Sequence, residues 1–297
     1  MSMRICFRTV ASYSLVFTNT GKSPSYLMEI VAVYNIKGGV GKTTTAVNLA
    51  YRSAADGWPT LLWDLDPQGA ATYILRRDPH VEGGSKQLIR GEQETSELIT
   101  PTDYANLDLL PSDFSYRRMD VHLSQRKNPA TRLLKLMRPL KQRHACLILD
   151  CAPGMSLASE NVMYAADALV VPLLPSALSV RTLEQLFEFV ASKNWPDLKL
   201  LPFFSMVDRR KLLHKETIEA LRQRFPIILD TEVPYGSDFE KITLRRAPVE
   251  SYAPGSVAAG VYRALWREID ARLQAAVPMG SERAGQVGPS AAQLRAV

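Results

Sequence analysis

The chain has 297 residues, of which 46% are hydrophobic and 22% are charged, and its formal net charge is +6. These values are typical of a folded, water-soluble protein, and the positive charge weakly favours an acidic partner such as nucleic acid. No apolar run approaches the roughly 18 residues that a membrane span needs. The three cysteines, Cys6, Cys146 and Cys151, form no C-x-x-C pair. This excludes a disulfide framework and a cysteine-rich metal site, and it indicates the cytoplasm.

Residues 1–27 differ in composition from the rest, because they contain no acidic residue, whereas Glu29 follows shortly after. They have no clear periodicity and no convincing cleavage site, so a secretory signal is not expected. Met28 leads directly into the first predicted strand. The favoured interpretation is a start codon assigned too far upstream, and the alternative is a flexible arm with a function of its own. We expect one domain over 28–277 and a disordered tail over 278–297.

A glycine-rich loop at 37–44 follows an apolar, β-branched run and precedes a helix-compatible segment. A strand, a glycine loop and a helix in this order form a cradle in which backbone N–H groups face a phosphate. Lys42 is expected to reach the β- and γ-phosphates, and the Thr43 hydroxyl to coordinate Mg²⁺. The expected nucleotide-binding residues of this loop are Lys37, Gly38, Gly39, Val40, Gly41, Lys42, Thr43 and Thr44. The usual pattern begins with glycine, but Ile36 occupies that position here.

Carboxylates follow two further strands. Asp64 and Asp66 come after a short buried run at 60–63, where the carboxyl edge of a parallel sheet binds ligands. Aspartate before proline is also a common turn former, but the position about twenty residues after a phosphate loop favours metal and water ligands. A continuous apolar strand at 145–150 ends at Asp150, as a Walker B strand requires. We therefore predict Mg²⁺ ligands at Thr43, Asp64 and Asp150.

Together, K-G-G-V-G-K-T-T at 37–44 and D-L-D-P-Q at 64–68 resemble the ParA/MinD group of ATPases, whose phosphate loop deviates in the same way. The resemblance extends from about residue 28 to about residue 276. It implies that Lys37 reaches across a dimer interface to the partner subunit's nucleotide, that Asp66 orients or activates the attacking water, and that Asp64 supports the Mg²⁺ shell. The expected catalytic residues are thus Lys37, Lys42 and Asp66. We also expect Asp208 and Pro234 to contact the nucleotide.

Strands alternate with helices along the domain, which predicts βαβ units and a doubly wound, mainly parallel sheet with helices on both faces. The predicted helices lie at 43–55, 70–77, 157–166, 178–192, 212–225 and 257–276, and the predicted strands after the first at 60–63, 107–111, 145–150, 168–172 and 199–207. Residues 78–106 are polar and are expected to hold a short helix among loops.

Basic residues are concentrated at 116–143, where nine lysines and arginines face one acid, Asp120. Such a run is usually a solvated face, but its one-sided charge raises the chance of contact with a phosphate backbone. The candidate DNA contacts are Arg117, Arg118, Arg209, Arg210, Arg245 and Arg246.

The resemblance implies an ATPase that forms a homodimer around ATP and Mg²⁺, binds DNA without sequence preference and is switched by a ParB-like partner or another cargo adaptor. Plasmid or chromosome partitioning, or cargo positioning, would be its role, in the cytoplasm and at the nucleoid if it binds DNA. A P-loop switch that acts on a protein partner without DNA is the alternative.

Other classes fit the sequence less well. A MinD-like membrane switch would need a basic amphipathic helix at its C-terminus, which the glycines and prolines of 278–297 disfavour. An iron–sulfur reductase would need cluster-ligating cysteines, and a GTPase would normally carry N-K-x-D. A DNA-binding regulator that keeps the glycine loop only as a structural remnant, without ATPase activity, fits poorly, because Lys42, Asp66 and Asp150 are intact.

Overall fold

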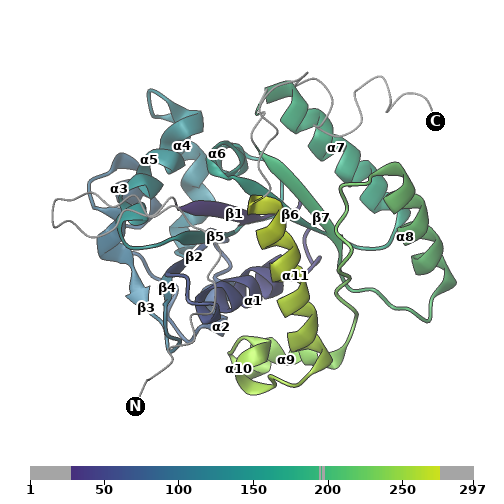
Figure 1. Cartoon of the computed structure of the whole chain (residues 1–297). Coiled ribbons are helices and arrows are strands. Elements are labelled where there is room, and N and C mark those ends of the chain that lie inside the picture. Colours follow the sequence, from purple (N-terminus) through teal and green to yellow (C-terminus); the bar gives the residue numbers. More distant parts are fainter. Residues whose placement is uncertain (1–27, 194, 196–197, 275–297) are drawn as a thin grey trace, which may run out of the picture.

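The computed structural model describes residues 28–193, 195 and 198–274. Its described strands form one seven-stranded sheet in the order β3-β4-β2-β5-β1-β6-β7 (Figure 1). The strands are β1 Glu29–Val33, β2 Thr60–Asp64, β3 Thr100–Pro101, β4 Leu107–Leu110, β5 Cys146–Asp150, β6 Ala168–Leu173 and β7 Lys199–Phe204. All neighbours are parallel except β3 and β4. The predicted doubly wound, mainly parallel sheet is confirmed.

Helices cover both faces of this sheet (Figure 1). The α-helices are α1 Lys42–Ala55, α2 Ala70–Ile74, α3 Gly84–Arg90, α4 Met119–Ser124, α5 Arg132–Met137, α6 Leu157–Ala165, α7 Ala177–Lys193, α8 Leu212–Arg224, α9 Ser237–Arg245, α10 Val249–Tyr252 and α11 Val257–Gln274. Short 3₁₀ helices are η1 Thr95–Leu98, η2 Phe114–Arg118, η3 Pro129–Thr131 and η4 Arg138–Gln142. No helix in the described ranges is long and apolar enough to span a bilayer.

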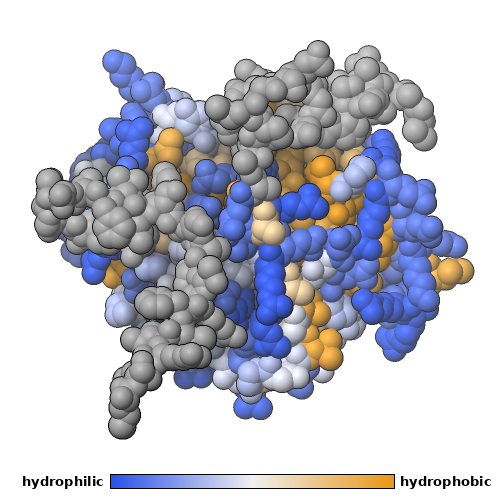
Figure 2. Space-filling view, in the orientation of Figure 1, coloured by the Kyte–Doolittle hydropathy of each residue, from blue (hydrophilic) through white to orange (hydrophobic). Residues whose placement is uncertain are grey.

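The core is divided by the sheet into two apolar layers. Val31 and Val33 of β1 face one layer, which also contains Trp266 of α11. Ala32 faces the other layer, together with Leu183 of α7. Because the central strands are covered on both faces, their sequences are continuous apolar runs without alternation. On the outside, hydrophilic side chains dominate over α8, at the right of Figure 2.

The strand register aligns the ends of β1, β2 and β5. Val33 of β1 and Asp64 of β2 both pair with Asp150 of β5. Parallel strands point the same way, so the segments that follow these three residues emerge at one edge of the sheet. The fold therefore brings the glycine loop and both carboxylate segments together.

The structure departs from the sequence predictions at several boundaries. The predicted helix at 70–77 ends at Ile74, and Arg76 adopts a φ of 59°, which no helix continues. Strand β7 stops at Phe204, before Met206 with its φ of 56°. Helix α9 was not predicted, although Phe239 and Ile242, three residues apart, place an apolar face of this nine-residue helix against the core. The predictions for 1–27 and 278–297 lie outside the described residues.

Candidate functional site

The loop between β1 and α1 requires glycine at two positions. Gly39 and Gly41 have φ angles of +70° and +89°, a region that other residues rarely adopt. A Cβ on Gly41 would also lie 3.1 Å from the Ser205 Oγ. At Gly38 a Cβ would meet no atom within 4 Å, so the space in front of the loop is open. The loop therefore packs against Ser205 at Gly41, whereas at Gly38 it is open to a ligand.

The loop forms one wall of a pocket of about 190 Å³. The pocket is lined by Gly38, Gly39, Gly41, Lys42, Thr43, Thr44, Asp66 and Pro153. The N-terminus of α1, with its free backbone N–H groups and positive end of the helix dipole, begins at this wall. The structure therefore joins the glycine loop to Asp66 and adds Pro153, which the sequence analysis did not single out.

Two lysines lie on the loop in different environments. Lys42 is 7% exposed, and its Nζ donates to the Lys37 carbonyl oxygen at 3.1 Å. Burial lowers the pKa of Lys42, while Asp150 and Asp66 act in the opposite direction. Burial also lowers the pKa of Lys37, whose ammonium has no ion pair within the described residues. Lys42 is therefore directed into the loop, and Lys37 remains available to an outside anion.

Asp150 is fully buried, and within the described chain neither of its carboxyl oxygens has a hydrogen-bond partner. Burial, followed by the Asp64 charge, raises the pKa of Asp150 well above its ordinary value, whereas the Thr43 hydroxyl and Lys42 lower it. A buried polar group without a partner is costly. A cation beside Thr43 would satisfy this carboxylate.

The Asp64 carboxyl already has partners. It accepts hydrogen bonds from the Thr72 backbone N–H at 2.8 Å, from the Thr72 hydroxyl at 2.7 Å and from the Asp66 N–H at 3.2 Å. Burial raises its pKa to about 6. These bonds hold the turn that carries Asp66, whose own carboxylate accepts only from the Gln68 N–H, at 3.0 Å, among the described donors. Direct metal ligation by Asp64 stays a prediction.

No three His, Cys, Asp or Glu side chains within the described ranges are grouped so that they could hold a metal ion. Mg²⁺ at nucleotide sites is bound by one or two carboxylates together with phosphate oxygens and water. Asp150 and Thr43 fit such a shared Mg²⁺ site, because the carboxylate is unpartnered and the hydroxyl lines the pocket.

Two polar residues that the sequence analysis missed hold the loop in place. Asn35 is 2% exposed, its Nδ2 donates to the Pro172 carbonyl at 2.7 Å, and its Oδ1 accepts from the Lys37 N–H at 2.8 Å. Ser205, after β7, packs against Gly41. Asn35 lies directly between the strand and the loop in the sequence, but only its partner on β6 reveals its role.

Asp208 and Pro234, expected at the nucleotide, come close together beside this site. Val207 forms an isolated parallel bridge with Pro234. The neighbouring Met206 lies 3.7 Å from the position of a Cβ on Gly41. The Arg210 guanidinium binds the Asp208 carboxylate at 2.9 and 3.0 Å, which lowers the pKa of Asp208 to about 2. Neither residue lines the pocket, and their contact with nucleotide stays a prediction.

The candidate DNA contacts fall into two groups. Arg117 and Arg118 of η2 are exposed, and Arg117 lies 4.0 Å above the ring of Phe114. The other four are Arg209, Arg210, Arg245 and Arg246, near the C-terminal part of the domain. Arg209 pairs with an acid, as Arg210 does, and Arg246 packs over Tyr73. Only Arg245 of this second group is exposed without a recorded ion pair in the described chain.

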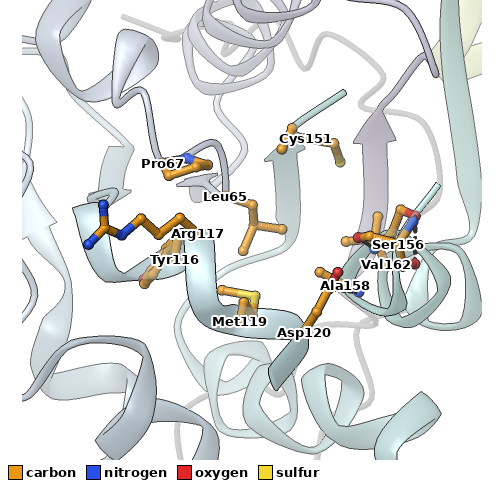
Figure 3. Close-up of a pocket in the computed structure, with 12 residues that line it drawn as sticks. Leu65, Pro67, Tyr116, Arg117, Met119, Asp120, Cys151, Ser156, Ala158 and Val162 are labelled. Atoms are coloured by element: carbon orange, nitrogen blue, oxygen red, sulfur yellow. Dashed lines mark hydrogen bonds between the residues drawn. The ribbon is translucent and has the colours of Figure 1, made fainter. Parts of the chain in front are cut away.

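A second pocket, of about 170 Å³, is lined by residues that adjoin Asp66 and Asp150 in the sequence (Figure 3). Leu65 and Pro67, which flank Asp66, line it together with Cys151, which follows Asp150. Its shape therefore depends on the positions of both carboxylate segments. Its remaining lining residues are Tyr116, Arg117, Met119, Asp120, Ala152, Ser156, Ala158, Ser159 and Val162.

Comparisons with known proteins identify the family of the chain. A family model described as an AAA domain matches residues 28–195. The chromosome partitioning protein ParA of Myxococcus xanthus is 30% identical over 246 residues, which cover 81% of this chain and 87% of that protein.

Two solved structures resemble the fold. Cobyrinic acid a,c-diamide synthase from Mycobacterium smegmatis, with bound ADP and magnesium, has a TM-score of 0.72 and 25% identity over 84% of this chain and 96% of that one. The cell division ATPase MinD of Pyrococcus furiosus has a TM-score of 0.67 and 22% identity over 82% and 99%. The chain therefore belongs to the AAA domain family and, within it, to the ParA/MinD-like P-loop ATPases.

Proposed function

We propose that this protein hydrolyses ATP to ADP and phosphate with Mg²⁺, and that it dimerises around ATP to position a cargo on DNA. One observation carries the ATPase part of the proposal: the glycine loop, Lys42 and Asp66 line a single pocket, and the unpartnered carboxylate of Asp150 is buried close to Lys42 and Thr43.

Binding depends on the loop. The backbone N–H groups of the loop and the start of α1 would donate to the phosphate oxygens. Lys42 would leave the Lys37 carbonyl and turn to the β- and γ-phosphates, whose charge also offsets the cost of its burial. Thr43 and Asp150 would hold Mg²⁺, which when bound neutralises negative charge on the phosphates.

Hydrolysis then requires a positioned water. Asp66 lies at the rim of the pocket with a largely unengaged carboxylate. It would orient the water that attacks the γ-phosphorus, as the bond to the bridging β–γ oxygen breaks and ADP leaves. The enzyme's contribution is positioning and charge stabilisation, because phosphoryl transfer involves little covalent chemistry by the protein.

Dimerisation and cargo positioning rest on resemblance, on one local feature and on the name of a relative. Lys37 is half-buried at the mouth of the loop and, within the described chain, has no acidic partner, so it suits a phosphate brought by a second subunit. The relative from Myxococcus xanthus is named a chromosome partitioning protein, which supports DNA as the partner. A ParB-like adaptor is proposed from the resemblance alone.

ATP turnover by four purified full-length variants tests the catalytic assignment. Lys42→Ala should abolish nucleotide binding. Asp66→Ala should retain ATP affinity within a few-fold but lose at least about 10²-fold in turnover, the usual range for a positioned acid–base group. The controls Lys135→Ala and Asp78→Ala remove the same charges from exposed positions outside the pocket and should behave as wild type. Equal turnover by Asp66→Ala and wild type would refute the role of Asp66.

A further inference from the structure

Charges on the candidate DNA-binding arginines are neutralised unequally. Arg209 lies 3.6 Å from Glu232, and Arg210 binds Asp208 at 2.9 Å. Arg246 donates to the Tyr73 carbonyl at 2.9 Å and stacks 4.2 Å from its ring. An arginine that is paired with a carboxylate adds little attraction for a polyanion, because the negative charge of the carboxylate largely cancels the positive charge of the guanidinium. Of this C-terminal group, only Arg245 and Arg246 have no acidic partner among the described residues, and Arg246 is held against Tyr73.

A different surface concentrates unpaired positive charge. Lys86 and Arg90 of α3 and Arg118 of η2 all act electrostatically on His122 of α4 and, after burial, lower its pKa. Since charges interact in this way only at short range, these cations converge on one place from three elements. Lys86 and Arg118 are exposed and have no ion pair in the described chain.

The helices beneath these cations are joined by hydrogen bonds. The Ser85 hydroxyl donates to the Ser115 carbonyl at 2.8 Å and lies 3.0 Å from the His122 Nδ1. The Ser85 N–H donates to the Ser115 hydroxyl at 2.7 Å. This network ties α3, η2 and α4 together, so the charges are carried on a rigid base and little ordering is needed when a ligand binds.

The surface continues onto α5. Arg132 donates from Nε to the Ile89 carbonyl at 2.6 Å, directly beside Arg90. Arg126 in turn lies close enough to lower the pKa of Arg132, after the effect of burial. The ion pair recorded on this surface in the described chain joins Arg90 to Glu92 at 3.3 Å, with both side chains nearly half-exposed. Hydrophilic side chains project near α4, at the upper left of Figure 2.

Resting on the proposed function, we propose that the phosphate backbone of duplex DNA docks on the α3–α5 basic face, which comprises Lys86, Arg90, Arg118, Arg126 and Arg132. A duplex carries closely and evenly spaced negative charge, which complements cations that are spread over several elements. The C-terminal arginines then serve mainly internal contacts. Arg117, held over Phe114, lies at the margin of this face.

Two double variants with the same change in net charge provide the test. Lys86→Ala with Arg118→Ala removes two unpaired cations from the basic face. The control, Arg209→Ala with Lys241→Ala, removes two exposed cations that are paired with Glu232 and Asp238. Fluorescence anisotropy of two labelled duplexes of unrelated sequence, with the full-length protein, ATP and Mg²⁺, measures affinity over a series of salt concentrations. Thermal unfolding and ATP turnover without DNA verify that both variants fold and keep the nucleotide site.

The first double variant should lose at least about tenfold in affinity on both duplexes, and the slope of log K against log salt should become shallower by about 0.9 for each lost phosphate contact. The control should stay within about twofold of wild type. Equal losses in the two variants, or a larger loss in the control, would overturn the assignment to this face while leaving DNA binding intact. Wild type that binds neither duplex at low salt would overturn DNA binding itself, while ATP turnover would still stand.

His122 gives an independent readout. The protein has four histidines, so its ring can be identified by NMR with a His122→Gln variant. DNA phosphates on this face would offset Lys86, Arg90 and Arg118 and should raise the pKa of His122. An unchanged His122 pKa at saturating DNA would contradict contact at this face.

Discussion

Each glycine of the phosphate loop can be needed for three reasons: a positive φ, a lack of space for a Cβ, or close approach of the ligand. Alanine substitutions at Gly38, Gly39 and Gly41 separate these reasons. Gly38 is outside the positive-φ region and has no neighbour within 4 Å of a Cβ. Gly39 has a φ of +70° but equally open surroundings. Gly41 has both a φ of +89° and the Ser205 Oγ at 3.1 Å from a Cβ. The three positions therefore form a graded series.

The expected changes in the free energy of unfolding follow from these differences. Gly38→Ala should be neutral or stabilise by about 0.4–1 kcal/mol, because alanine restricts the unfolded chain. Gly39→Ala should destabilise by roughly 1–2 kcal/mol, the cost of a left-handed conformation for an L-residue. Gly41→Ala should cost that amount and a further 1 kcal/mol or so from crowding against Ser205, which is 3% exposed and has little room to move.

Urea denaturation without nucleotide measures all three variants, and a double-mutant cycle with Ser205→Ala isolates the crowding. In the Ser205→Ala background Gly41→Ala should cost no more than Gly39→Ala. ATP affinity provides the complement: Gly38→Ala should bind ATP more weakly despite its intact stability, because the Cβ projects into the space proposed for phosphate. Zero coupling in the cycle would refute the packing argument. Full ATP affinity of Gly38→Ala would refute close approach of the phosphate to that glycine.

Two further predictions concern charge. Burial, then Asp270 and Asp167, raise the pKa of Glu29 from 4.5 to about 7. The folded protein therefore retains a proton that the unfolded chain releases above pH 4.5, and the resulting stability is lost as pH rises through about 7. Glu29→Gln should match wild type at pH 4.5 and exceed it at pH 8 by roughly 1–2 kcal/mol, after allowance for screening of its exposed part; equal urea midpoints at pH 8 would contradict this. Lys37→Ala should leave ATP binding by the monomer intact, since Lys42 remains, but should weaken the ATP-dependent dimer in sedimentation with Mg²⁺. A mutant that dimerises like wild type would remove Lys37 from the interface.

The sequence by itself was sufficient for the class of fold and for the meeting of the glycine loop with Asp66 at one pocket. Continuous apolar runs predicted buried parallel strands, and their ends predicted where Asp66 and Asp150 would meet the glycine loop. These inferences succeed because residues within one strand–loop–helix unit are local in the chain, and because parallel strands present their carboxyl ends at one edge. Helix α9 escaped prediction although Phe239 and Ile242 lie on one face of it, because a nine-residue segment with two core-facing residues gives a short pattern.

Only the tertiary structure decided which charges and polar groups are still free. In the sequence, Arg118 and Arg210 look alike, yet one is unpaired in the described chain and the other binds Asp208. Likewise, Asp64 has its oxygens occupied by Thr72 and Asp66, whereas Asp150 has no partner in the described chain. Electrostatic and hydrogen-bond partners are set by distances of a few ångströms between segments far apart in the chain. No composition or spacing rule encodes those distances, because they arise from how the layers pack.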